Sequence, residues 1–139
     1  IWKAIKGVTV GGDVGTLFDR LNCTVTVDGT IVPHHDFIAV IATTVDDIGI
    51  GFRPMYRAYE KDGTFHILSV GCEPSDIVRN LVKIKRGKPI HHPYLFDSIA
   101  RKAVITSEKK MLYTVDGDMY EAEKKLVAEI GPPVKLIYV

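Results

Sequence analysis

The stretch "VTVDGTIVPHHDFIAVIATT", residues 25–44, decides the fold of this 139-residue chain. Its first residues alternate between valine and threonine or aspartate, a pattern typical of a strand with one face in water. It ends in "FIAVIA", an unbroken apolar run that predicts a strand buried on both faces. A half-exposed strand beside an enclosed one indicates a layered β structure.

Short β-branched runs, bounded by Gly, Pro, Asp or Asn, occur along the whole chain. They predict six strands, at residues 23–27, 36–44, 64–70, 102–107, 111–115 and 134–139. We therefore expect a mostly β chain, specifically an antiparallel β-sandwich with one or two helices.

One helix is predicted in the segment "SDIVRNLVKIKRG", residues 75–87. Ser75 is placed to cap its start, apolar side chains share one face, and Gly87 ends it. The segment 120–133 fits either a short helix or an edge strand. The predicted helix also carries a basic run, for which a solvated helix end is the simpler interpretation and a membrane-surface role the alternative: Lys83, Lys85, Arg86 and Lys88.

Composition indicates one globular domain, residues 1–139, long enough to bury a sizeable core. Eighteen Lys and Arg residues stand against 17 Asp and Glu, so charge does not favour a nucleic-acid partner. No apolar run reaches the ~20 residues of a membrane-spanning helix. The two cysteines lack zinc-site spacing, which favours reduced thiols in a cytoplasmic protein. Because the chain begins without Met and inside a helix-like pattern, we expect a fragment of a longer protein.

A glycine-rich loop occurs in "VTVGGDVGTLFDRL", residues 8–21. Such a loop either directs backbone N–H groups at a phosphate or simply turns the chain. Only ten residues precede Gly11, too few for the strand framework of a nucleotide domain. We therefore expect Gly11 to Gly15 to form a surface turn.

The dipeptide Asp-Gly occurs three times, at 28–29, 62–63 and 116–117. Taken singly, each favours a hairpin turn, since glycine accepts a positive φ and aspartate bonds to nearby backbone. The order of the segments around them carries more information. "VTVDGTIVPHHDFIAVIATT" is followed by "GIGFRPMYRAYEKDGTFHILSV", the predicted helix, "ARKAVITSEKKMLYTVDGDMY" and a terminal strand.

This order resembles the C-terminal half of the diacylglycerol kinase catalytic family, the bacterial lipid kinases related to sphingosine and ceramide kinases. The resemblance covers most of residues 20–139. It rests on the order and spacing of two short motifs, whose residues are Gly49, Gly51, Pro54, Ala58, Asp62, Gly63 and Phe65 in the first, and Asp116, Gly117 and Asp118 in the second.

The resemblance implies a two-domain kinase in which this chain is most of the C-terminal β-sandwich. An upstream nucleotide-binding domain would supply ATP, the sandwich would hold the lipid between its sheets, and the γ-phosphate would pass to a hydroxyl of diacylglycerol or a related lipid. The chain alone would then be inactive. The implied location is the cytoplasm, with peripheral contact at the inner membrane.

The resemblance also implies site residues. The Asp62 carboxylate and the carbonyls of Tyr59 and Thr64 would bind a structural magnesium, a reasonable oxygen donor set for that ion. The motif Asp116–Gly117–Asp118 would lie near the ATP phosphates, with Asp118 accepting the proton of the lipid hydroxyl.

Two residues depart from the family pattern. Asp118 stands where the family has glutamate, so its carboxylate is one methylene shorter, and Lys61 stands beside Asp62 where relatives often have an acid. The second hypothesis is therefore a non-catalytic lipid-binding or regulatory module derived from such a kinase. A third is the C-terminal domain of an NAD kinase, which shares the two-domain plan. The oligomeric state stays open.

Overall fold

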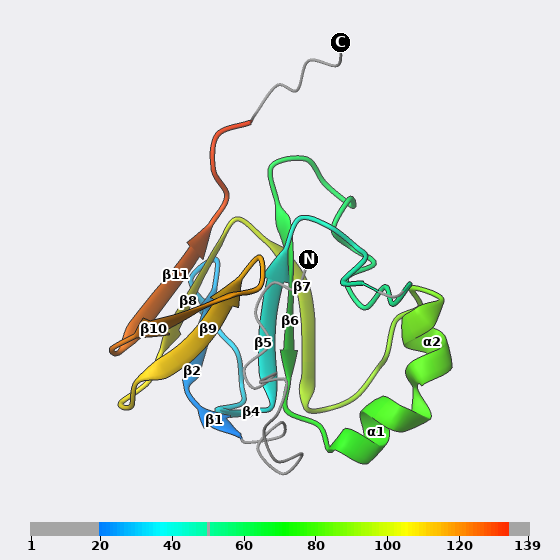
Figure 1. The fold of residues 1–139 in the computed structure, drawn as a ribbon, viewed down its shortest axis with the longest axis horizontal. Helices are drawn as coiled ribbons and strands as arrows, with labels where there is room; N and C mark the ends of the chain where they lie inside the picture. The colour runs from blue at the N-terminus through cyan, green and yellow to red at the C-terminus, as the bar shows by residue number, and fades with distance from the viewer. Residues whose placement is uncertain (1–19, 50, 134–139) are drawn as a thin grey trace.

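The computed structural model describes residues 20–49 and 51–133, which form antiparallel sheets and two short helices (Figure 1). In chain order the elements are β1 (Leu21–Asn22), β2 (Thr24–Val27), β3 (Thr30–Ile31), β4 (Asp36–Phe37), β5 (Ala39–Thr43), β6 (Phe65–Val70), α1 (Pro74–Arg79), α2 (Leu81–Lys85), β7 (Leu95–Ala100), β8 (Lys102–Thr106), β9 (Met111–Val115), β10 (Asp118–Ala122) and β11 (Lys125–Glu129). The predicted mostly β fold with antiparallel sheets and two helices is confirmed.

Two larger sheets, the two-stranded pairs β1–β4 and β9–β10, and one layer of helices make up the described part of the chain. A three-stranded sheet in the order β5–β6–β7 packs against a four-stranded sheet in the order β11–β8–β2–β3, with the β9–β10 hairpin beside the latter (Figure 1). The helices α1 and α2 lie on the other side of β5–β6–β7. No helix in the described part of the chain is long and apolar enough to span a bilayer.

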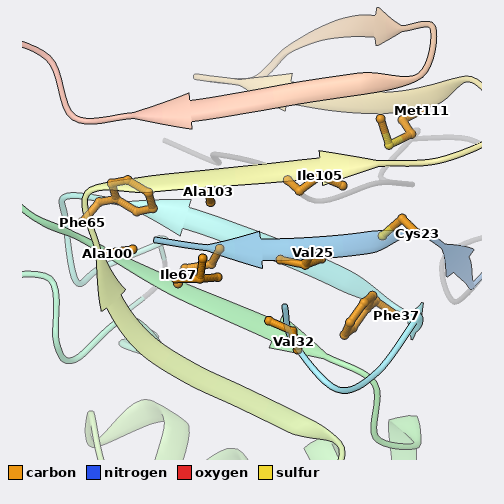
Figure 2. Packing of buried hydrophobic residues seen from close by; sticks show 11 residues of the cluster. Cys23, Val25, Val32, Phe37, Phe65, Ile67, Ala100, Ala103, Ile105 and Met111 are labelled. Atoms are coloured by element: carbon orange, nitrogen blue, oxygen red, sulfur yellow. The ribbon is translucent and has the colours of Figure 1, made fainter. Parts of the chain in front are cut away.

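The central strand β6, "FHILSV", is buried along its whole length. Because side chains alternate along a strand, Phe65 and Ile67 pack between the sheets, whereas Leu68 and Val70 point toward the helices. Figure 2 shows the inter-sheet cluster, in which Phe65 and Ile67 meet residues of the four-stranded sheet such as Val25 and Ile105. The central sheet thus has two covered faces and two separate cores.

Two of the three Asp-Gly pairs are hairpin turns. Asp28–Gly29 joins β2 to β3 and Asp116–Gly117 joins β9 to β10, and all four residues have positive φ, as a type I′ turn requires. The third pair, Asp62–Gly63, is not a two-residue hairpin turn: it lies at the end of the long connection between the paired strands β5 and β6. Its surroundings are therefore not those of a simple hairpin.

The prediction of one continuous helix in the segment 75–87 is wrong in its start and its continuity. The helix begins at Pro74, with Glu73 at the N-cap, so Ser75 is inside the first turn and does not cap it. Proline is suited to the first helical position because its fixed φ is helical and its missing N–H is not needed there. The Asn80 side chain donates to the Asp76 carbonyl at 2.8 Å, and the backbone leaves helical geometry there.

Other strand predictions have mixed outcomes. The segment 120–133 is not a helix: it contains the end of β10 and the edge strand β11. The strand β7 was not predicted, because Asp97 and Ser98 interrupt its apolar pattern. The predicted strand at 134–139 and the predicted surface turn at Gly11 to Gly15 lie outside the described residues.

Candidate functional site

A cluster of four polar side chains lies at the start of β6, on the face toward the helices. Asp97 on β7 is its centre: its carboxylate accepts from Tyr56 Oη at 2.7 Å, His66 Nε2 at 3.0 Å and Arg57 Nη1 at 3.2 Å. The backbone N–H of Arg57 donates to His66 Nδ1 at 3.4 Å. Nδ1 is therefore the acceptor, and Nε2 carries the hydrogen that it donates to Asp97. The other end of the Arg57 guanidinium binds both oxygens of Glu60.

The cluster is partly withdrawn from water, so its hydrogen bonds have strong effects on ionisation. His66 is fully buried and the Asp97 side chain is 15% exposed. Burial alone would raise the pKa of the Asp97 carboxyl, but the hydrogen bonds from His66 and Tyr56 outweigh it and hold that pKa below its ordinary value. Burial and the hydrogen bond to Asp97 raise the pKa of Tyr56 to about 12. Asp97 is therefore ionised and Tyr56 protonated at neutral pH.

The lowered pKa of Asp97 predicts an acid-sensitive contribution to stability. The unfolded carboxyl has a pKa of about 3.9, so the ionised form stabilises the fold fully above about pH 4 and progressively less as the pH falls through the folded value. We expect Asp97→Asn to have a lower free energy of unfolding than the wild type, and the difference should be largest near neutral pH. Urea denaturation at a series of pH values should show this difference shrink under acid conditions, and a constant difference would contradict the prediction.

An apolar cavity of about 290 Å³ lies between the β5–β6–β7 sheet and the helices. Its walls are mainly aliphatic and come from the sheet, the connection after β5, and both helices, as in Ile41, Phe52, Leu68, Ile77 and Leu81. Among the described residues that line it, those with polar side-chain groups are Tyr56, Lys88 and Asp97. The polar cluster thus forms one wall of an otherwise apolar cavity.

An open groove of about 600 Å³ adjoins this cavity, because Tyr56 and Asp97 line both. The groove is polar, with Arg57, His91 and His92 among its lining residues. The two spaces together present an apolar interior and a charged, hydrogen-bonding exterior. That is the arrangement an amphiphilic ligand needs, since its tail loses water and its headgroup keeps polar partners.

The resemblance implied that the lipid binds between the two sheets. That gap is largely filled by the core cluster (Figure 2). One pocket inside it has only about 50 Å³. A wider groove of about 490 Å³ opens at the end where β6 begins, with Phe65 and Val115 among its lining residues. The apolar cavity of about 290 Å³ is on the opposite face of the central sheet, whereas large side chains such as Phe37 and Met111 occupy much of the inter-sheet space.

The predicted magnesium residues lie in the connection that leads into β6. Tyr59 is 70% exposed, Asp62 is exposed, and Thr64 is buried with its hydroxyl donating to the Lys61 carbonyl at 2.6 Å. Within residues 20–49 and 51–133, no three His, Cys, Asp or Glu side chains gather as a metal site. An accessible carboxylate and backbone carbonyls are oxygen donors, which suit magnesium better than a softer metal.

The predicted catalytic motif forms the tip of the β9–β10 hairpin. Asp116 and Gly117 are the two turn residues, and Asp118 begins β10 with an exposed side chain. Val115, directly before the turn, and Phe65, directly after Thr64, line the same groove. The fold therefore brings the two predicted motifs, which are more than fifty residues apart in sequence, to one end of the central sheet.

Sequence reasoning missed the most heavily bonded residue of this site. The sequence pattern did not single out Asp97, whose carboxylate accepts a hydrogen bond from the fully buried His66. A carboxylate inside the run "LFDSIA" was the available signal. A buried charged residue needs a polar or charged partner, so an aspartate in a strand-like segment predicts a hydrogen-bonded partner elsewhere in the fold.

No protein-family model matches the chain, and a comparison with curated proteins found no match. Similar solved structures exist. A protein assigned as a diacylglycerol kinase from Bacillus anthracis strain Sterne aligns with a TM-score of 0.61 and 16% identity over 80% of this chain. A structure named as a diacylglycerol kinase from the same strain gives 0.59 and 15% over 81%, and another assigned to that activity gives 0.56 and 16% over 80%.

These likenesses establish the fold. The chain spans about two fifths of the length of the similar structures, with 39%, 41% and 38% of each covered. The predicted resemblance to bacterial diacylglycerol kinases is confirmed at the level of fold.

Proposed function

We propose that the chain is the substrate-side domain of an ATP-dependent lipid kinase that phosphorylates a hydroxyl of diacylglycerol or a related lipid. The observation that carries the proposal is the apolar cavity whose polar wall is the Tyr56–Asp97 pair. A fold shared with diacylglycerol kinases supports it. The full protein would then be cytoplasmic, with peripheral contact at the inner membrane.

The cavity would take an acyl chain and the adjoining polar groove the headgroup. Aliphatic walls gain free energy by covering a hydrocarbon chain, at about 25 cal/mol for each Å² removed from water. Tyr56 and Asp97 stand at the boundary of the two spaces, and their hydrogen bonds hold them in one geometry. A glycerol-like headgroup would therefore be oriented by fixed polar groups while its tail is desolvated.

The start of β6 connects the predicted metal loop, the groove beside the β9–β10 turn and the polar cluster. Thr64 ends the predicted metal loop, Phe65 borders the groove that Val115 also lines, and His66 bonds to the cluster at the cavity wall. Phosphoryl transfer depends mainly on positioning and charge stabilisation, so a site assembled at one sheet end suits it. ATP would enter from an upstream nucleotide-binding domain facing this end.

Each predicted residue has a defined role in this proposal. Asp118 would orient the lipid hydroxyl and accept its proton as the oxygen attacks the γ-phosphate. Asp62, with the carbonyls of Tyr59 and Thr64, would hold magnesium, an ion that stabilises structure and negative charge where it binds. Asp116 and Gly117 would place the backbone of the turn beside the phosphates.

Filling the cavity tests the proposal directly. Leu81 lines the cavity from α2 and is 40% exposed. Leu81→Trp would therefore place a larger side chain in the cavity from the helix side, away from the central sheet. We expect the full-length protein carrying this change to phosphorylate long-chain diacylglycerol in detergent micelles at least about tenfold more slowly. That loss corresponds to the binding free energy of about two buried methylene groups. Short-chain substrate should be affected less.

Ser75→Trp is the matched control, because Ser75 is exposed on α1 and does not line the cavity. It should leave both substrates unaffected. Equal activity of Leu81→Trp and wild type on long-chain lipid would remove the cavity from the substrate path. Phosphorylation of NAD in place of any lipid would replace the proposal by the NAD kinase hypothesis.

A further inference from the structure

The outer side of α1 and α2 exposes aliphatic side chains that cover nothing in the described part of the domain. Val78 and Val82 are each 63% exposed, and Leu81, which also reaches the cavity, is 40% exposed. Ile77 and Ile84 instead turn inward to the cavity. In a segment of only eleven residues or so this exposure is dense, and such patches mark contact surfaces.

Four cations lie in the same short stretch of chain as these aliphatic residues. Lys83, Lys85, Arg86 and Lys88 are exposed, and among the described residues none of them forms an ion pair. The acids of the same segment are already engaged, since Glu73 pairs with Arg20 and Asp76 with Arg79. The local field is therefore positive, although the whole chain carries a net charge of only +1.

We propose that this surface docks onto the face of an anionic lipid bilayer. The surface consists of Val78, Leu81, Val82, Lys83, Lys85, Arg86 and Lys88, and is called the α1–α2 outer face below. The proposal rests on the proposed function and deepens it, because it names where the lipid comes from. Anionic headgroups complement the four unpaired cations, and the exposed aliphatic side chains enter the headgroup boundary between them.

The combination matters because neither contribution is large alone. Each Lys or Arg near an anionic bilayer raises affinity by about fivefold, and each embedded valine by roughly tenfold or more. Together they favour reversible surface binding, in keeping with the absence of a spanning helix in the described residues. Since α1 and α2 are also the outer wall of the cavity, docking would set that cavity next to the membrane (Figure 1).

Vesicle binding of the full-length protein tests the proposal without ATP or activity. The vesicles contain equal parts of phosphatidylglycerol and phosphatidylcholine, or phosphatidylcholine alone, and binding is measured by sedimentation. We expect binding to the mixed vesicles that weakens with salt, a loss of about 30-fold in Lys83→Glu/Lys85→Glu, and a loss of roughly tenfold in Val82→Asp.

Two matched variants serve as controls. Ile31→Asp changes a side chain of the same exposure, 61%, on β3, and Lys124→Glu/Lys125→Glu reverses two exposed cations before and in β11. Both should bind like wild type. Equal binding to both vesicle types, or equal losses in the controls, would overturn the proposal. So would a dimer in light scattering that Val82→Asp dissociates, because a second copy would then cover the face.

The docking proposal and the proposed function fail in different ways. Phosphorylation of a short-chain lipid dissolved without vesicles reports on the kinase site alone. If that activity is present and no variant changes vesicle binding, the docking proposal is wrong and the function stands. If vesicle binding maps to the α1–α2 outer face and no lipid is phosphorylated, docking is supported and the kinase proposal is wrong.

Discussion

Asp97→Ala is expected to lower the free energy of unfolding by about 3 kcal/mol, the cost of removing one partner from a buried charged network. The Asp97 carboxylate accepts hydrogen bonds from Tyr56, His66 and Arg57, so its loss leaves Tyr56 and His66 without this acceptor, while Arg57 keeps the backbone carbonyl of residue 97. His66 suffers most because it is fully buried and water does not replace the carboxylate. The connection before β6 loses its anchor at the same time.

Urea denaturation of the chain measures this effect, with Asp36→Ala as control. Asp36 also pairs with an arginine, Arg20, but its side chain is 56% exposed, so its removal should cost less than about 1 kcal/mol. Asp97→Asn keeps the shape and one acceptor oxygen and should lie between the two. Equal losses for Asp97→Ala and Asp36→Ala would show that the polar cluster contributes no more than a surface ion pair.

Asp118→Asn in the full-length protein is expected to lower the rate of lipid phosphorylation by about 10²- to 10⁴-fold, the usual contribution of a general base. The substitution keeps the size of the side chain and removes its ability to accept a proton. Because Asp118 is exposed at the start of β10, stability should not change. The measurement is the initial rate with ATP and a panel of lipids, together with a melting curve.

Glu121→Gln is the matched control, since Glu121 lies on the same strand, is exposed, and pairs with Lys110 at the surface. It should retain wild-type activity. Asp118→Glu restores the residue typical of the resembled family and should keep or raise the rate. If Asp118→Asn is as active as wild type, Asp118 has no part in the reaction. If the wild type retains lipid but turns over no ATP, the non-catalytic module becomes the better hypothesis.

How far the site could be predicted differs between its residues. Asp62 and Asp118 could be proposed from the sequence because they lie in or next to Asp-Gly pairs, which are short, local signals, and because the order of the segments resembles a known family; two of the three pairs do form type I′ turns, and the roles of Asp62 and Asp118 stay predictions. Asp97 was missed because its meaning depends on Tyr56, Arg57 and His66, which lie 31 to 41 residues away. The helix start was misassigned because Ser75 and Pro74 are both acceptable near a helix N-terminus, and the local pattern did not choose between them.

The sequence by itself determined the class of fold and several of its strands, such as β2, β6, β8 and β9, because alternation and apolar runs indicate which side chains leave water. It also indicated the hairpin turns, whose backbone angles few residues other than glycine, asparagine and aspartate accept. Only the tertiary structure decided where the apolar cavity lies. Phe37 and Met111 fill much of the space between the sheets, whereas the cavity lies on the other face of β6, against α1 and α2. That choice depends on side chains far apart in sequence packing to the density of a protein interior, which no local pattern records.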